Sequence, residues 1–127
     1  MNPLEILQVT LDTLLYPDGV HAYWQRKAKT GDPDEYIVYT LDGDPAEFWA
    51  DDETTIRTAN IALRYYYRDT LLGTSAGRKK IRDRAAAIVA ALEAAEFDVP
   101  NGAFDAGDID DIGFGTTIIE CFYGRAV

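Results

Sequence analysis

The clearest pattern along the chain is a strict alternation of side-chain types from Thr58 to Asp69, TANIALRYYYRD. Successive side chains of a strand point to opposite faces, so this segment predicts one long strand. One face, which we expect to be core, carries Ala59, Ile61, Leu63, Tyr65 and Tyr67. The other face carries Thr58, Asn60, Ala62, Arg64, Tyr66 and Arg68. Tyr and Arg are enriched where protein surfaces meet, so Arg64, Tyr66 and Arg68 are candidate interface residues.

Two other segments repeat apolar residues at helical spacing. The first starts where Asn2 can cap a helix with Pro3 in its first turn, and the turn 16–19 ends it. The second follows Thr74 and Ser75, whose side-chain oxygens can cap it. Its apolar stripe is Ile81, Ala85, Ile88, Val89, Leu92 and Ala95. We predict two helices that pack on the sheet.

Four shorter segments complete the expected fold. Strands are predicted at 22–27, 36–41, 46–50 and 116–123, and a glycine- and aspartate-rich loop at 105–115. The strand 36–41 has apolar residues on both faces, which is typical of a central strand. The order is α-β-β-β-β-α-β, which predicts one α+β domain over 1–127 with a mainly antiparallel four- to five-stranded sheet packed by two helices.

Composition narrows the classes of partner. Twenty-two acidic residues against twelve basic ones give a net charge of -10, which disfavours a nucleic acid gripped by the overall surface. The one cysteine, Cys121, cannot form an internal disulfide, and its apolar surroundings predict a buried thiol in a cytosolic protein. The first residues do not resemble a signal peptide, and no apolar run is long enough to span a bilayer, so we expect no membrane partner.

Charged clusters are the remaining candidate sites. Basic residues fill the first two turns of the second helix, where they oppose its macrodipole: Arg78, Lys79, Lys80, Arg82 and Arg84. They form either a solvated face or a contact with acids of the same or a neighbouring chain. The acidic clusters are Asp51, Asp52 and Glu53, and Asp105, Asp108, Asp110 and Asp111. Turn chemistry explains the first of them.

No cluster matches a metal or nucleotide motif. The stretch from Asp108 begins like a calcium loop, but Ile112 and Ile119 occupy positions that need oxygen ligands. GTSAGRKK at 73–80 has three residues between its glycines, where a phosphate-binding loop has four. His21 is the only histidine and Ser75 the only serine, so a nucleophile has few possible bases. We predict no enzyme activity, no metal and no cofactor.

Several short motifs, in order along almost the whole chain, give it a family resemblance. Asp32-Pro33-Asp34-Glu35 precedes Tyr36-Ile-Val-Tyr39, and Asp51-Asp52-Glu53 leads to the long strand that ends Tyr65-Tyr66-Tyr67-Arg68-Asp69. The second helix ends Leu92-Glu93-Ala94-Ala95-Glu96-Phe97, and Asp110-Asp111-Ile112-Gly113-Phe114 precedes the last strand. In this order the chain resembles the tail terminator and tail completion proteins of long-tailed bacteriophages.

The resemblance implies a structural virion protein of the tail neck, made in the cytoplasm of the bacterial host. Such a protein, without a cofactor, forms a ring, expected to be hexameric, that caps the tail tube and faces the head connector. Whether its subunits are monomers before assembly stays open. DNA would pass the ring without specific binding. Two alternatives remain: another neck or minor capsid-associated protein of the same fold, or a small acidic ligand-binding or enzyme domain.

A ring joins each subunit to the next through two different patches, for which opposite charges are expected. The basic patch would hold Arg78, Lys79, Lys80 and Arg82. The acidic patches would hold Asp51, Asp52, Glu53, Asp108, Asp110 and Asp111. A negative pore wall would also repel the phosphates of DNA.

Overall fold

The computed structural model describes residues 3–24, 34–41, 57–106 and 113–125. Its elements are α1 (Pro3–Leu15), the 3-10 turn η1 (Tyr16–Asp18), β1 (His21–Trp24), β2 (Glu35–Leu41), β3 (Arg57–Arg68), α3 (Asp69–Leu72), α4 (Ser75–Ala94), β4 (Ala103–Asp105) and β5 (Phe114–Arg125). The fold is α+β. The predicted strand at 46–50 lies outside the described residues, and the described order differs from the expected one because it contains two elements that were not predicted, α3 and β4.

The strands form one sheet in the order β1-β2-β3-β5-β4. β1 runs parallel to β2, and the other neighbours pair antiparallel. The sheet is therefore mixed, and the expectation of a mainly antiparallel sheet is wrong. Parallel and antiparallel strands have the same alternation of side chains, so the residue pattern of the first two strands does not reveal the direction in which they pair.

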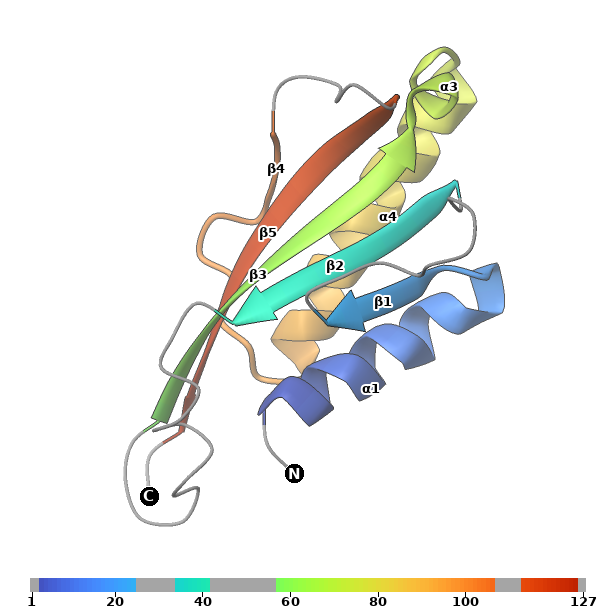
Figure 1. Ribbon diagram of the computed structural model, residues 1–127. Coiled ribbons are helices and arrows are strands. Elements are labelled where there is room, and N and C mark those ends of the chain that lie inside the picture. Colours follow the sequence, from blue (N-terminus) through green and yellow to red (C-terminus); the bar gives the residue numbers. More distant parts are fainter. Residues whose placement is uncertain (1–2, 25–33, 42–56, 107–112, 126–127) are drawn as a thin grey trace.

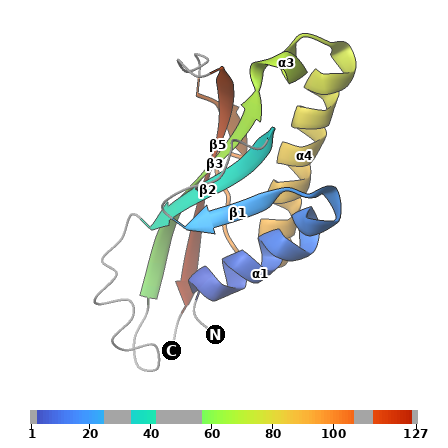
Figure 2. The ribbon, with the colours of Figure 1, turned by 45° about the vertical axis from the view of Figure 1, so that its right-hand side comes forward.

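Both long helices lie on the same side of the sheet (Figures 1 and 2). α1 lies beside β1 and contacts α4, which extends along the far side of the longer strands (Figure 1). β4, the edge strand opposite β1, was not predicted, and neither was the short helix α3. In β4 all three residues are exposed, so it has no alternation of buried and exposed positions from which a strand can be recognised.

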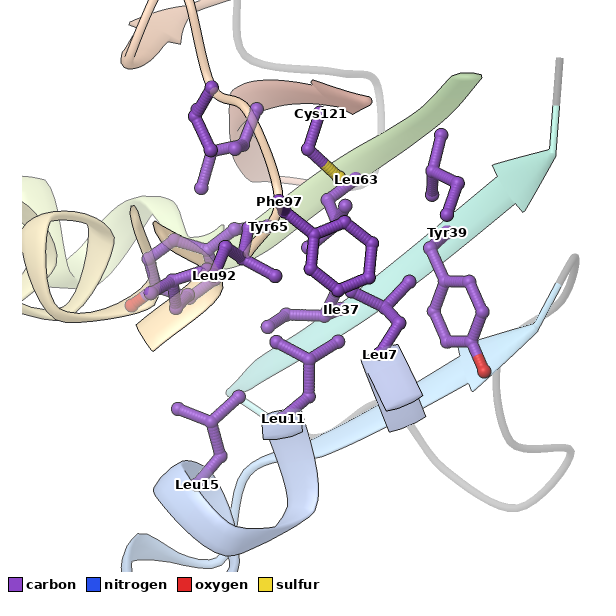
Figure 3. Packing of buried hydrophobic residues seen from close by; sticks show 14 of the residues in the cluster. Leu7, Leu11, Leu15, Ile37, Tyr39, Leu63, Tyr65, Leu92, Phe97 and Cys121 are labelled. Carbon is purple, nitrogen blue, oxygen red and sulfur yellow. The ribbon is translucent and has the colours of Figure 1, made fainter. Parts of the chain in front are cut away.

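The core fills the space between the helices and the sheet. Leu7, Leu11 and Leu15 of α1 point toward Ile37 of β2 (Figure 3). The buried face of β3 is confirmed at the positions that the alternation indicated: Ile61, Leu63, Tyr65 and Tyr67. β5 contributes Ile119, Cys121 and Tyr123 from the same face, so the predicted buried cysteine is confirmed. α4 contributes Ile81, Ala85, Ile88 and Leu92.

The corner between α3 and α4 explains the glycine-rich segment that resembles a phosphate-binding loop. The Thr74 hydroxyl accepts a 2.9 Å hydrogen bond from the Gly77 amide, which is the predicted helix cap. Gly77 also lies at a close approach of the two helices, because a Cβ there would lie 1.9 Å from the Leu71 carbonyl oxygen. The segment is therefore a helix start that needs a glycine for packing. Among the described residues, no helix is both long and apolar enough to cross a membrane.

Candidate protein interface on the open sheet face

The sheet face opposite the helices carries no described helix, and we call it the open face (Figure 2). Strand register defines its central positions, since Tyr36, Val38 and Thr40 of β2 pair with Tyr66, Arg64 and Ala62 of β3. On the other side of β3 the same face continues on β5 with Phe114, Thr116, Ile118, Glu120 and Phe122. Phe104 of β4 pairs with Ile118. The three predicted residues Arg64, Tyr66 and Arg68 thus lie on one face, in the middle of the sheet.

One end of the open face is held by contacts among four side chains, which we call the aromatic cluster: Tyr36, Tyr66, Arg68 and Phe114. Tyr36 stacks on Tyr66 with ring centroids 4.9 Å apart and meets the edge of Phe114 at 5.5 Å. The Arg68 guanidinium lies 4.7 Å from the centre of the Phe114 ring. Such ring and cation contacts each stabilise by about 1 kcal/mol and fix the side chains. Tyr36 and Phe114 are themselves buried, so the cluster fixes the two partly exposed side chains, Tyr66 and Arg68, on the open face.

Arg68 is oriented by a second contact, an ion pair from its Nε to Asp34 Oδ1 at 3.2 Å. This contact leaves Arg68 half-buried between the ring and the carboxylate. Its backbone amide also bonds the Asp34 carbonyl, at 3.0 Å. Arg68 is therefore a structural part of the open face, and its guanidinium is engaged within the chain.

Arg64 differs from Arg68 because it is exposed and none of the described residues forms an ion pair with it. Its register neighbours are Val38 on one side and Ile118 on the other, both apolar and half-buried. A guanidinium flanked by apolar side chains is typical of a residue that contributes strongly to binding. Arg64 therefore places an exposed positive charge on the central strand of the open face.

Beneath the sheet, part of the basic cluster binds an acid of the same chain. Arg84 Nε donates to Glu35 Oε1 at 2.8 Å, Lys80 Nζ lies 3.1 Å from Glu35 Oε2, and the Tyr65 hydroxyl also donates to Oε1. Arg84 Nη1 bonds Asp18 at 3.0 Å. Of the two explanations for the basic cluster, contact with acids holds for these two residues. Lys80 and Arg84 join α4 to the sheet.

The charges around Glu35 determine its protonation. Burial by itself raises the pKa of the carboxyl, but the hydrogen bonds from Tyr65 and Lys80 and the positive charges of Arg84 and Lys80 outweigh burial, so the pKa lies below its ordinary value. Burial and the bond to Glu35 raise the pKa of Tyr65. Glu35 is therefore a carboxylate in the folded protein at neutral pH. It was predicted only as part of an acidic approach to a strand.

The rest of the basic cluster faces outward. Lys79 pairs with Asp83 one turn later at 2.6 Å, and Arg78 donates to the Leu72 carbonyl at 2.7 Å. Arg82 is exposed and forms no ion pair with the part of the chain that is described. The predicted acidic interface residues lie outside the described residues: Asp51, Asp52, Glu53, Asp108, Asp110 and Asp111.

Two cavities flank α4 among the described residues. One, of about 490 Å³, lies between α1 and the start of α4, and its charged groups, such as Asp18 and Lys80, are paired within the chain. The other is a groove of about 650 Å³ between α4 and β4. His21, the only histidine, lines neither of them and instead meets the Tyr16 ring at 5.0 Å. The described residues contain no group of three or more His, Cys, Asp or Glu side chains placed to hold a metal ion.

Sequence reasoning missed two members of the aromatic cluster. Phe114 was assigned to a loop because glycines flank it, and Tyr36 was counted only as a central-strand residue. The alternation in 36–41 places Tyr36 on the face opposite Ile37, which was a usable signal. No protein-family model matches the chain, and a search of curated proteins finds no match.

Proposed function

We propose that this chain is a structural subunit of the neck of a bacteriophage tail, where it caps the head-proximal end of the tail tube and joins it to the head connector. The observation that carries the proposal is the open face, with its preformed aromatic cluster and the exposed Arg64. Tyr and Arg side chains fixed on an extended surface supply contact area at a small entropic cost. The open face is the surface we assign to contact with the tail tube or the connector.

Two further features support this function. The described elements keep the coarse order on which the resemblance rests: a helix at the start, a long strand ending in tyrosines, a long helix and a last strand. The net charge of -10 suits a ring around a DNA channel, because repulsion keeps phosphates off the wall. On this proposal the protein resides in the virion and binds protein partners.

Electron microscopy of tail tubes tests the proposal. Tubes would be assembled from the tail tube protein of the same phage, with and without the purified chain. The proposal predicts a ring at one end of each tube and an end to further elongation there. A chain that leaves the tube ends bare and their growth unchanged would contradict it.

A further inference from the structure

The start of β2 depends on side-chain contacts for part of its support. Glu35 is the first residue of β2, and the register pairs it with Tyr67 near the end of β3 (Figure 1). β1 pairs with β2 only from Tyr36 onward. Among the described strands, Glu35 therefore has a neighbour on one side only. The contacts of its own side chain hold this end of the strand in place.

On the helix side of the sheet, these contacts come from α4. Lys80 and Arg84 lie one helical turn apart, and both reach the Glu35 carboxylate, at 3.1 Å and 2.8 Å. Arg84 is itself held by Asp18 of η1, at 3.0 Å. A buried carboxylate that loses a cation is left with an uncompensated charge, which favours its movement toward water. α4 thus keeps Glu35 beneath the sheet.

The two residues next to Glu35 in the chain hold the exposed part of the aromatic cluster. Asp34 accepts two hydrogen bonds from Arg68: its carbonyl from the amide at 3.0 Å, and its Oδ1 from Nε at 3.2 Å. Tyr36, on the open face, stacks on Tyr66 with ring centroids 4.9 Å apart. Each of the two partly exposed members of the cluster therefore contacts a neighbour of Glu35.

Strand geometry connects the two faces of the sheet at this point. Successive Cα atoms lie about 3.8 Å apart, and successive side chains point to opposite faces. The peptide units are planar, so a displacement of Glu35 also moves Asp34 and Tyr36. The contacts from α4 to the open face therefore run through three consecutive residues.

We infer that Glu35, held by Lys80 and Arg84, is a positioning residue of the open face, where it keeps Arg68 and Tyr66 in the orientation that a partner contacts. The inference rests on the proposed function for that partner. It adds that the helix side of the molecule controls the binding surface on the other side. Lys80 and Arg84 then support binding although neither lies on the open face.

Nuclear magnetic resonance of the Arg68 side chain tests this inference without a partner. In the native protein the Arg68 Nε–H donates to Asp34, and the guanidinium lies over the Phe114 ring. In Glu35→Gln its signal should move toward that of the exposed Arg64 Nε–H. Exchange of the Nε proton with solvent should become at least ~10-fold faster, because Asp34 is no longer held in place.

Controls show whether the change is local. The Phe122 amide, which donates to the Asp98 carbonyl at 2.8 Å and lies opposite Asn60 of β3, should keep its signal. Glu93→Gln makes the same chemical change at an exposed carboxylate of α4 and should leave the Arg68 signal unchanged.

Variants of the two cations separate positioning from stability. Lys80→Met removes only the half-exposed cation and should shift the Arg68 signal in the same direction. Arg84→Met should shift it as well, whereas Arg84→Lys keeps a cation at Glu35 and should restore it. A role in stability alone would change the fraction of folded molecules and leave their Arg68 signal in place. An unmoved signal in folded Glu35→Gln would overturn the inference. If Glu35→Gln does not fold, Lys80→Met decides in the same way.

The tail-tube assay distinguishes this inference from the proposed function. Glu35→Gln and Lys80→Met should cap fewer tubes than the wild type, and Glu93→Gln should cap as many. If wild-type protein caps the tubes but the Arg68 signal does not move in the variants, only the inference fails. If the signal moves but wild-type protein leaves the tube ends bare, only the proposed function fails.

Discussion

Arg84 of α4 and Glu35 of β2 lie 49 residues apart in the chain, and their side chains meet in a 2.8 Å hydrogen bond where each is less than 10% exposed. With Lys80 and Tyr65, this contact fastens the first half of α4 to the sheet. The contact explains why Lys80 and Arg84 lie near the N-terminal end of α4, where the helix macrodipole favours acidic residues. The basic cluster is thus divided between an inner pair and an outer group.

Removing Arg84 should destabilise the fold. Arg84→Ala leaves the Glu35 carboxylate buried with one cation fewer, and we expect the free energy of unfolding to fall by about 3 kcal/mol. Arg82→Ala, two residues earlier in the same helix, is the matched control and should change it by less than about 0.5 kcal/mol. Urea denaturation followed by circular dichroism measures both. Equal effects of the two variants would contradict the role assigned to Arg84.

Glu35 should also make stability depend on pH in the acid range. Its folded-state pKa lies below the ordinary value of 4.5, so the stabilisation is fully present above about pH 4.5 and is lost as pH falls through the lower, folded-state pKa. Glu35→Gln removes this contribution. The stability difference between wild type and Glu35→Gln should shrink as the pH is lowered from 6 to about 3. A difference that stays constant over this range would show that Glu35 does not titrate as described.

Gly77→Ala should destabilise the α3–α4 corner although alanine favours helices. The new Cβ would lie 1.9 Å from the Leu71 carbonyl oxygen, which is backbone, so α3 must move. We expect a loss of about 1–3 kcal/mol. Gly73→Ala is the control, because its Cβ would lie 3.4 Å from its nearest neighbour, the Thr70 carbonyl oxygen. Thermal unfolding of the two variants separates the outcomes, and a stabilised Gly77→Ala protein would contradict the close approach.

Much of the fold follows from local periodicity. The alternation in 58–69 identified the buried residues of β3, and the Thr74 cap with the stripe from Ile81 to Leu92 identified α4. These features depend on neighbours within a few residues, which the sequence displays directly. The direction in which β1 pairs with β2 cannot be predicted in this way, because antiparallel and parallel strands have the same alternation of side chains.

The candidate site was predictable only in part. Arg64, Tyr66 and Arg68 share a face because of period-two geometry, which the structure confirms. Which of the two arginines is held by contacts within the chain could not be predicted. Arg68 contacts Asp34 and Phe114, which lie 34 and 46 positions away in the sequence, and Arg64 does not contact them. Glu35 likewise was predicted only as part of an acidic approach to a strand, and its contact with Arg84, 49 residues away, could not be predicted from local pattern. Contacts between distant segments decide which charged residues remain for a partner.

Cys121 should be unreactive in the folded protein. Burial raises the pKa of its thiol to about 12, so almost no thiolate exists at pH 8. We expect 5,5′-dithiobis(2-nitrobenzoic acid) to react with the folded chain at least ~100-fold more slowly than with the chain in concentrated urea. Rapid reaction of the native protein would contradict the buried position of Cys121.

The open face is tested most directly by a double variant in the tail-tube assay. Arg64→Ala with Tyr66→Ala removes the exposed guanidinium and the stacked ring, at a cost to stability of about 1–2 kcal/mol. The milder Arg64→Lys with Tyr66→Phe keeps a charge and a ring and serves as the matched control. Both variants should remain folded, as urea denaturation would show. We predict that wild-type protein caps the tubes, that the alanine variant leaves the ends bare, and that the control caps them partly. Capping by the alanine variant at the wild-type level would contradict the assignment of this face to a protein partner.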